Sequence, residues 1–190
     1  RANASARKAV AIGLKANAAG GQAFALGSYA SATGSNSTAL GGAIDKDASG
    51  KIGTGEYTSA TGGLSMALGS ASQATQDNAT AVGAESEASG IGATAVGSTS
   101  LASGTGAATL GFGAQATADG AVAIGWNSIA NVANTVSFGG NGTYRELVNV
   151  ADPTTAHSAV NREYLQNHYA TTAQMAAASP LIANAGSADH

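Results

Sequence analysis

The chain has no cysteine and, among its 190 residues, two prolines, one tryptophan and three phenylalanines. Large aliphatic and phenylalanine side chains are scarce, whereas Ala, Gly, Ser and Thr make up more than half of the sequence. An ordinary globular domain of this length needs more large aliphatic side chains for its core than this chain can supply. Disorder is also disfavoured, because the formal net charge of −3 is small. The composition therefore indicates a repetitive fold whose thin interior takes small side chains.

Basic residues are missing from a long central stretch, since no Lys or Arg lies between Lys51 and Arg145. Such a span offers no electrostatic footprint for nucleic acid or anionic lipid. The absence of Cys excludes disulfides, thiolate catalysis and Cys-based zinc sites. It fits the cytosol and equally a protein exported through an oxidising compartment. No apolar run reaches the roughly 18 residues of a membrane span. The segment Arg1–Lys8 is not a signal peptide, so if the protein is exported we expect this chain to be a piece of a longer one.

A 14-residue repeat runs through most of the chain. Most repeats carry a five-residue motif in which small and larger residues alternate before a final glycine, such as Ala9-Val-Ala-Ile-Gly13. Small residues follow the glycine at offsets three and five. Alternation with period two predicts strands, and glycines at offsets zero and seven predict positive φ at tight corners. One repeat spans roughly 46 Å when extended, enough for two short strands and two turns, which predicts a two-sheeted parallel β-roll. The glycines in register are Gly13, Gly27, Gly41, Gly55, Gly69, Gly83, Gly97, Gly111, Gly125 and Gly139.

The larger apolar residues of the repeat form two columns, one and three residues before the glycine. We expect the small residues to fill the roll and the larger ones to be buried against identical chains, because so long an apolar stripe would otherwise be exposed. The alternative is that the large residues fill the roll and the small ones face outwards. The predicted interface column is Ile12, Leu26, Leu40, Leu68, Val82, Val96, Leu110, Ile124 and Phe138, and the second column is Val10, Phe24, Ile52, Met66, Val122 and Val136.

The repeat ends at Gly139, and the sequence that follows differs in composition. We expect three parts: a β-roll head over residues 1–140, a neck leading into a helix over 141–169, and a stalk start or frayed tail over 170–190. The pattern predicts a short strand over 143–151, an N-cap at Asp152-Pro153 and a helix over 156–169. The spacing of Leu165, His168, Thr172 and Met175 is typical of the start of a coiled coil.

The repeats and the residues after them, in that order, resemble the head and neck of trimeric autotransporter adhesins of the YadA type. The residues that carry the neck resemblance are Arg145, Leu147, Asn149-Val150-Ala151, Ala159-Val160-Asn161 and Leu165. Two departures are Ser158, where the neck usually has Asp, and a degenerate coil between Gly41 and Gly69. The resemblance implies a left-handed roll, a homotrimer and a place on the bacterial outer membrane and cell surface, with the anchor outside this chain. It also implies adhesion to host extracellular matrix or cells, often through collagen, fibronectin or laminin.

The resemblance also singles out neck residues. It implies functional positions at Arg145, Asn149, Val150, Val160, Asn161 and Leu165. We expect Arg145 to pair with an acidic or carbonyl partner on a neighbouring chain. Val150 and Val160 are expected to pack under the last coil, where a wide roll narrows to a coiled coil.

No catalytic constellation is present in the repeats, so we expect a protein that is not an enzyme. The histidines His157, His168 and His190 all lie outside the repeats, and the sequence has no Walker loop, zinc-protease motif or nucleophile elbow. The alternative to an adhesin is a non-adhesive β-solenoid such as a fibre or ice-binding module. Regular Thr ladders would favour that alternative, and Thr is scattered in this sequence.

Aromatic residues recur at two positions near the repeat glycines. Phe112 and Trp126 occupy offset one of neighbouring repeats, so we expect them to stack and to cap the roll where it meets the neck. The alternative is that the two rings form a platform for a ligand. Tyr29 and Tyr57 share an outward column at offset two.

Residues 45–56 match the spacing of a calcium loop. Oxygen ligands would come from Asp45, Asp47, Ser49, the Lys51 carbonyl and Glu56, with a glycine at position six for the sharp turn. In the alternative interpretation the two aspartates only decorate a solvent-facing turn, and the segment from Lys51 to Gly55 is a strand of a degenerate coil. No other cofactor is expected.

Overall fold

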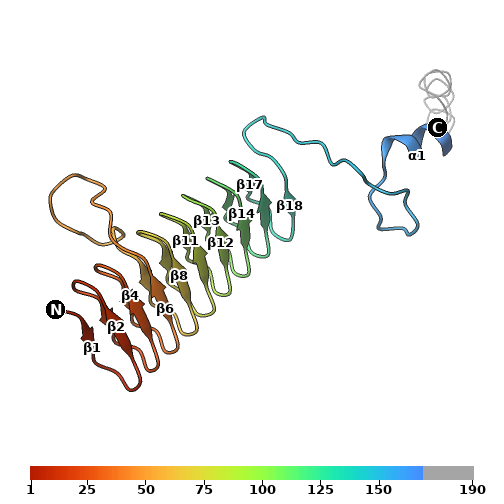
Figure 1. Ribbon diagram of the computed structural model, residues 1–190. Coiled ribbons are helices and arrows are strands. Elements are labelled where there is room, and N and C mark those ends of the chain that lie inside the picture. The colour runs from red at the N-terminus through yellow and green to blue at the C-terminus, as the bar shows by residue number, and fades with distance from the viewer. Residues whose placement is uncertain (169–190) are drawn as a thin grey trace, which may run out of the picture. The chain divides into compact units, whose positions relative to one another are not determined.

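The computed structural model describes residues 1–168, which form two compact units. The first unit covers Arg1–Arg145 and the second begins at Glu146. The first is a solenoid of parallel strands arranged in two nine-stranded sheets (Figure 1). Each strand pairs with the equivalent strand of the next coil, as in the register Val10↔Phe24 and Ile12↔Leu26. The β-roll predicted from the repeat is therefore confirmed.

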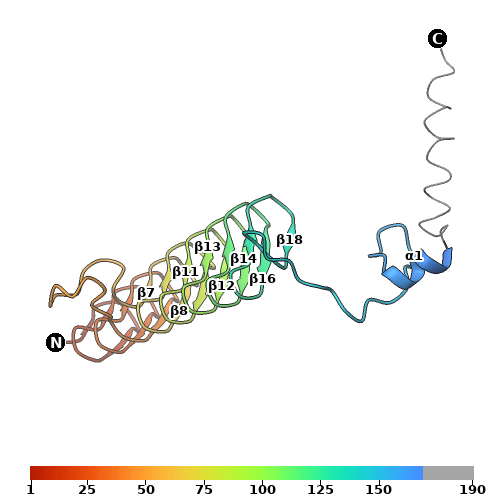
Figure 2. The same cartoon turned by 90° about the horizontal axis from the view of Figure 1, so that it is seen from above.

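The two sheets contain the odd-numbered and the even-numbered strands, and we call them the odd sheet and the even sheet (Figure 2). The odd sheet comprises β1 (Asn3–Ala4), β3 (Asn17–Ala18), β5 (Ser31–Ala32), β7 (Ser59–Ala60), β9 (Gln73–Ala74), β11 (Glu87–Ala88), β13 (Leu101–Ala102), β15 (Gln115–Ala116) and β17 (Ile129–Ala130). The even sheet comprises β2 (Val10–Ile12), β4 (Phe24–Leu26), β6 (Thr38–Leu40), β8 (Met66–Leu68), β10 (Thr80–Val82), β12 (Thr94–Val96), β14 (Ala108–Leu110), β16 (Val122–Ile124) and β18 (Val136–Ser137).

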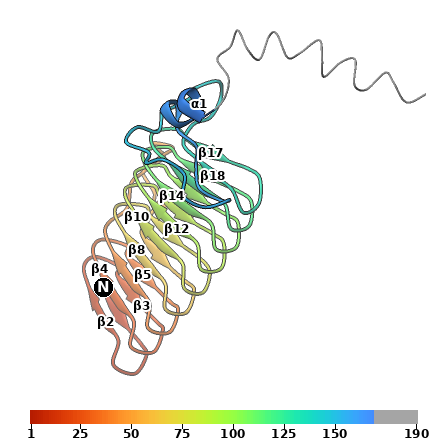
Figure 3. The same ribbon diagram turned by 90° about the vertical axis from the view of Figure 1, so that its right-hand side faces the viewer.

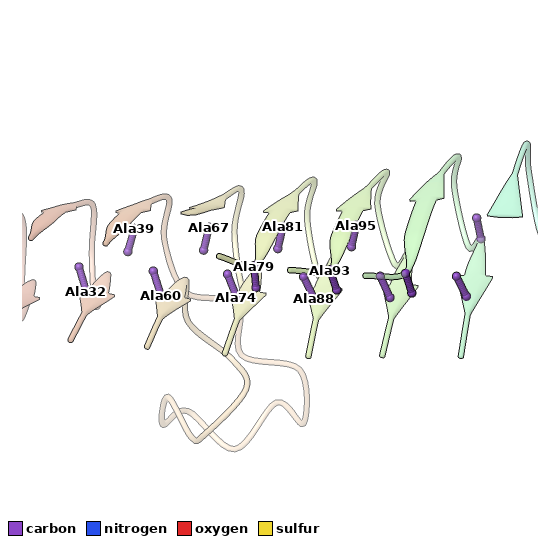
Figure 4. Close-up of a cluster of buried hydrophobic side chains, with 14 of the residues drawn as sticks. Ala32, Ala39, Ala60, Ala67, Ala74, Ala79, Ala81, Ala88, Ala93 and Ala95 are labelled. Carbon is purple, nitrogen blue, oxygen red and sulfur yellow. The ribbon is translucent and has the colours of Figure 1, made fainter. Parts of the chain in front are cut away.

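The space between the two sheets is filled almost entirely by alanine. Figure 4 shows alanines from both sheets pointing towards one another, for example Ala32 and Ala60 from the odd sheet and Ala39 and Ala67 from the even sheet. All four are 0% exposed. The prediction that small residues fill the roll is thus confirmed, and the alternative with large residues inside is wrong.

Serine takes some of the interior positions next to the turns. The hydroxyl of buried Ser86 donates to the Gly83 carbonyl at 2.8 Å. Ser37 and Ser65 donate in the same way to the carbonyl three residues earlier. A hydroxyl that finds its acceptor in its own turn avoids the cost of an unpaired buried polar group. Serine is therefore nearly as suitable as alanine at these positions.

Glycine is required where neighbouring coils touch through their backbones. Gly27 has φ +128°, and a Cβ at this position would lie 1.7 Å from the Gly41 carbonyl oxygen. The offset-seven glycines were expected to supply positive φ, but this expectation is wrong. A Cβ on Gly34 would instead meet the carbonyl oxygen of the next coil, that of Gly62, at 1.8 Å. Left-handed φ occurs at offsets two and nine, where Lys15 (54°) and Asn36 (56°) stand.

A loop of one repeat length leaves the solenoid between β6 and β7. Thr38 pairs with Met66 and Ser31 with Ser59, so each pair is separated by two repeat lengths instead of one. The antiparallel bridge Ala43↔Tyr57 closes the base of the loop, which projects from the coils in Figure 1. We call residues 43–56 the inserted loop. Gly55 belongs to this loop, so its place in the glycine register does not mark a coil.

Charge explains why the inserted loop is extruded. If its residues formed a coil, Lys46 and Lys51 would occupy offsets five and ten, which elsewhere point into the interior. Burying an unpaired ammonium among alanines costs several kcal/mol. The expectation that the segment from Lys51 to Gly55 forms a strand is therefore wrong.

The second unit contains one described helix, α1 (Arg162–His168). The helix was expected to begin near Ala156, but residues 156–161 are not helical. The short strand expected over 143–151 does not form either, and Thr143 makes only an isolated bridge to Gly140. Thr172 and Met175 of the expected coiled coil lie outside the described residues. Among residues 1–168 the structure has no helix long and apolar enough to cross a membrane.

We expect Gly34→Ala to destabilise the solenoid by about 3 kcal/mol or more, because its methyl group would overlap the Gly62 carbonyl of the next coil. Gly21→Ala is the matched control, since nothing lies within 4 Å of a Cβ there. Thermal and urea unfolding of both variants measure the difference. Equal stability of the two variants would contradict the close approach of the coils.

Candidate functional site

The outer face of the even sheet carries the predicted interface column. Leu26 pairs with Leu40 across the sheet and Leu40 with Leu68, so the side chains stand directly above one another. Ile12 and Leu110 are 54% and 56% exposed in the single chain. Phe138 follows β18 directly and is half-buried. The structure thus places the column on one outer face of the even sheet, whose strands are stacked along the solenoid in Figure 3.

The second column on this face differs from the expectation at one position. Val10, Phe24, Met66, Val122 and Val136 lie in it, as predicted. Ile52 was expected in the same column, but it lies in the inserted loop. Thr38, Thr80, Thr94 and Ala108 fill the remaining positions.

The expected stacking of Phe112 on Trp126 is not found. Both residues are exposed, at 54% and 61%, and the Phe112 carbonyl accepts a hydrogen bond from the Asn127 N–H at 2.9 Å. Within residues 1–168 the stacked aromatic pair is Tyr164 with His168, whose ring centroids are 4.0 Å apart. The same offset in neighbouring coils places two residues next to one another, but it does not fix the side-chain torsions that orient their rings.

The outer face of the odd sheet is polar and carries a column that the sequence analysis missed. Residues at offset six bear one hydroxyl per coil over six consecutive coils, and their N–H groups donate to equivalent carbonyls of the next coil. The signal was present at a fixed offset, but the serines mixed among the threonines concealed it. Beside it at offset four stand mostly polar residues such as Gln73 and Glu87. The hydroxyl column is Thr33, Thr61, Thr75, Ser89, Ser103 and Thr117.

Carboxylates gather in the inserted loop as the sequence predicted. Asp45, Asp47 and Glu56 each place one oxygen within 4.8 Å of the others. The Glu56 oxygens accept hydrogen bonds from the backbone N–H groups of Lys46 at 2.9 Å and Gly53 at 2.6 Å. Backbone donors therefore already stabilise the loop's most buried carboxylate.

The aspartates are likewise held by the loop's own donors. The Ser49 N–H donates to both Asp45 and Asp47 at 3.0 Å, and the Gly50 N–H donates to Asp45 at 2.8 Å. Hydrogen bonds from Ser49, first from its side chain and then from its backbone, lower the pKa of the Asp47 carboxyl, with a further contribution from Asp45. Asp47 is therefore ionised at neutral pH. The Ser49 hydroxyl and the Lys51 carbonyl lie 3.2 Å apart.

The inserted loop is also connected to the body of the solenoid. Lys46 Nζ lies 3.2 Å from Glu85 Oε2, and both side chains are partly exposed. Exposed ion pairs of this kind contribute about 1 kcal/mol or less. The pair therefore orients the loop against the coil of β11 rather than holding it rigidly.

Arg145 closes the last coil of the solenoid. Its guanidinium donates to the Ser128 hydroxyl at 2.9 Å, to the Trp126 carbonyl at 2.5 Å and to the Phe138 carbonyl. Carbonyl partners were expected on a neighbouring chain, whereas these belong to the same chain. Guanidinium is suited to this position because its planar fork can bind several acceptors at once.

Asn161 organises the neck residues of the second unit. Its Nδ2 donates to the Val150 carbonyl and to Asp152 Oδ1, both at 2.9 Å, and its Oδ1 accepts the Tyr164 N–H at 2.7 Å. Asn161 is thus the N-cap of α1, a role in which an Asn side chain satisfies a free amide of the first turn. The N-cap expected at Asp152 is therefore wrong, because Asp152 serves as an acceptor for the true cap.

The other neck residues predicted from the resemblance lie on the surface of this unit. Asn149 has left-handed φ, at 59°. Val160 and Leu165 are 51% and 47% exposed, and Val150 is half-buried. The packing of Val150 and Val160 under the last coil stays a prediction.

We expect the inserted loop to fold without a cation, because backbone N–H groups already satisfy its carboxylates. Titration calorimetry with millimolar Ca²⁺ should give no saturable heat, and the melting temperature should not change. Asp47→Ala is the matched variant. Saturable binding in the original chain that disappears in Asp47→Ala would instead establish Asp45, Asp47, Ser49, Lys51 and Glu56 as a calcium site.

Comparison with known proteins agrees with the fold. A family model described as the YadA head domain repeat matches residues 4–30, 18–43, 60–86, 88–114, 110–128 and 116–141. Residues 44–59, which no match covers, include nearly all of the inserted loop. A search of curated proteins finds no match. The crystal structure of the collagen-binding domain of the Yersinia adhesin YadA is similar with a TM-score of 0.72 and 29% identity, covering 87% of this chain and 85% of that one. The chain therefore belongs to the YadA head-domain repeat family.

Proposed function

We propose that this chain is the head and neck of a bacterial surface adhesin that attaches the cell to host extracellular matrix. The observation that carries the proposal is the division of the solenoid into an apolar and a polar outer face. One face is suited to assembly and the other to contact with a ligand. Membership of the YadA head family and similarity to a collagen-binding domain support this assignment.

The apolar face supports assembly as a homotrimer. Its residues stand in a column at the spacing of the coils, so the whole length of the even sheet can be covered by copies of the same face. Burying one such side chain contributes about 1.5–3 kcal/mol. The column repeats in every coil and in each chain, so the sum favours a permanent assembly over a transient one.

The odd sheet is the face that remains for a ligand in such an assembly. The hydroxyl column presents one hydrogen-bonding group per coil, and most offset-four residues beside it are also polar, so these groups are spread over a wide surface. An extended fibrous protein such as collagen, which the similar domain binds, fits a long surface of this kind. Adhesion needs no catalytic group, and the family consists of adhesins rather than enzymes. The proposed location is the outer membrane of a bacterium, facing the outside.

We expect Leu68→Asp or Ile124→Asp to dissociate or unfold the trimer, because each would place a carboxylate in a face buried by identical chains. Glu87→Lys, on the odd sheet, is the control and should do neither. Multi-angle light scattering at micromolar concentration measures the mass of all three variants. A stable monomer of the original chain would contradict the proposed assembly.

Binding of the intact chain to a panel of collagen, fibronectin and laminin tests the adhesive function. We expect saturable binding to at least one of them. Gln115→Arg combined with Thr117→Arg should weaken it by tenfold or more without changing the melting temperature, because both residues lie on the outer face of the odd sheet. Thr105→Arg, at an exposed turn, is the matched control. If none of the three proteins binds, the matrix ligand proposed here is wrong.

A further inference from the structure

Positive charge is concentrated at one end of the solenoid. Residues 1–44 contain four cationic side chains and no acidic one, whereas residues 45–144 contain seven acidic side chains against two lysines. The cations are Arg1, Arg7, Lys8 and Lys15. The central stretch without cations excludes a polyanion along most of the head, whereas the first coils carry the cations that a polyanion needs.

The cations border the outer face of the odd sheet. Arg7 and Lys8 lie in the turn between β1 and β2, and Lys15 lies in the turn between β2 and β3. These two turns stand at opposite ends of the short strands of the odd sheet. All three side chains are exposed. Because this face is opposite to the apolar face of the even sheet, the proposed trimer leaves it free.

The charges at this end have no acidic partner among residues 1–168. Over residues 1–168, the ion pair with both groups within 4.0 Å is Lys46 with Glu85, which is in the inserted loop and the coil of β11. Lys15 is held in place by a neutral partner instead. Its Nζ donates to the Tyr29 hydroxyl at 3.0 Å and lies 4.8 Å from the centre of that ring. A tyrosine orients an ammonium group without cancelling its charge.

Neutral hydrogen-bonding groups lie between the two charged turns. Asn3 Nδ2 donates to Asn17 Oδ1 at 3.0 Å, so two amides form a short ladder on the outer side of β1 and β3. The remaining amide donor and acceptor of this pair face solvent. The surface therefore combines cations at its borders with amides at its centre.

We propose that this surface binds a sulfated polysaccharide. Sulfate groups pair with ammonium and guanidinium ions, and the sugar hydroxyls between sulfates match the amides of Asn3 and Asn17. Nucleic acid is a poorer occupant, because bases stack on aromatic rings and this surface offers the single ring of Tyr29, whose hydroxyl already accepts a hydrogen bond from Lys15. An anionic membrane is also a poorer occupant of this surface. The apolar side chains that would enter a membrane lie on the even sheet, on the opposite side of the solenoid.

The test uses heparin as the probe and the intact chain. We expect saturable binding at 50 mM salt that weakens by about a hundredfold at 200 mM, the dependence expected for roughly four ionic contacts with a polyanion. Lys8→Gln combined with Lys15→Gln should weaken binding by tenfold or more. The matched control, Lys51→Gln combined with Arg162→Gln, removes the same charge elsewhere and should leave affinity within twofold. Melting temperatures confirm that both double variants are folded.

Several outcomes would overturn the proposal. Absence of heparin binding at 50 mM salt is one, and an equal loss in the control double variant is another, since it would show attraction to net charge alone. De-sulfated heparin should not bind. Binding of duplex DNA or of phosphatidylserine vesicles as tight as that of heparin would assign the surface to a different polyanion. Matrix proteins are tested separately, so failure here leaves the proposed adhesion untouched.

Discussion

The close stacking of one coil on the next is the constraint on which the rest of the structure depends. Parallel strands pair only at a short, fixed separation, and here the turns touch as well as the strands. At Gly27 and Gly34 the neighbouring carbonyl oxygen occupies the place where a Cβ would stand. The two sheets are also close, so that alanines such as Ala39 and Ala60 fill the space between them. Glycine in the turns follows from the short separation between coils. Alanine in the strands follows from the short separation between the two sheets.

Because the interior is thin, its apolar core contributes less to the stability of the fold than the core of a globular domain does. Alanine buries little apolar area per residue, so the regular ladder of backbone hydrogen bonds and the packing of outer faces must contribute more than in a globular domain. Buried serines such as Ser86 add no unpaired hydroxyl because each bonds within its own turn. The large aliphatic side chains that an ordinary fold would use internally are displayed on the even sheet. In the proposed trimer, identical chains cover that face and bury these side chains.

The two sheets have different outer faces, and the proposed assembly and ligand contacts use different sheets. In the proposed trimer, assembly uses the even sheet, and the odd sheet keeps its hydroxyls and amides for contacts with other molecules. The solenoid accommodates residues 43–56 as an insertion at a turn between two strands. The coils before and after the inserted loop still pair directly with one another. At the last coil, the Arg145 guanidinium donates hydrogen bonds to the Trp126 and Phe138 carbonyls. In earlier coils, backbone N–H groups of the next coil fill this role.

Much of this could be predicted from the sequence, because a repeat applies the same local rule many times. Glycine spacing, alternation and small residues predicted the β-roll, its alanine interior and its outward apolar column without any long-range information. Four features required the tertiary structure. Gly55 kept the glycine register although its segment is a loop, since only the pairing of Thr38 with Met66, across the insertion, reveals which coils are neighbours. The N-cap at Asn161 depends on Val150 and Asp152, which are not its neighbours in the sequence. The Arg145 partners are likewise distant along the chain. Phe112 and Trp126 do not stack, because an equivalent offset does not fix the side-chain torsions that orient two rings. Periodicity determines which positions are equivalent, whereas the identity of a spatial neighbour is decided by how the chain closes on itself.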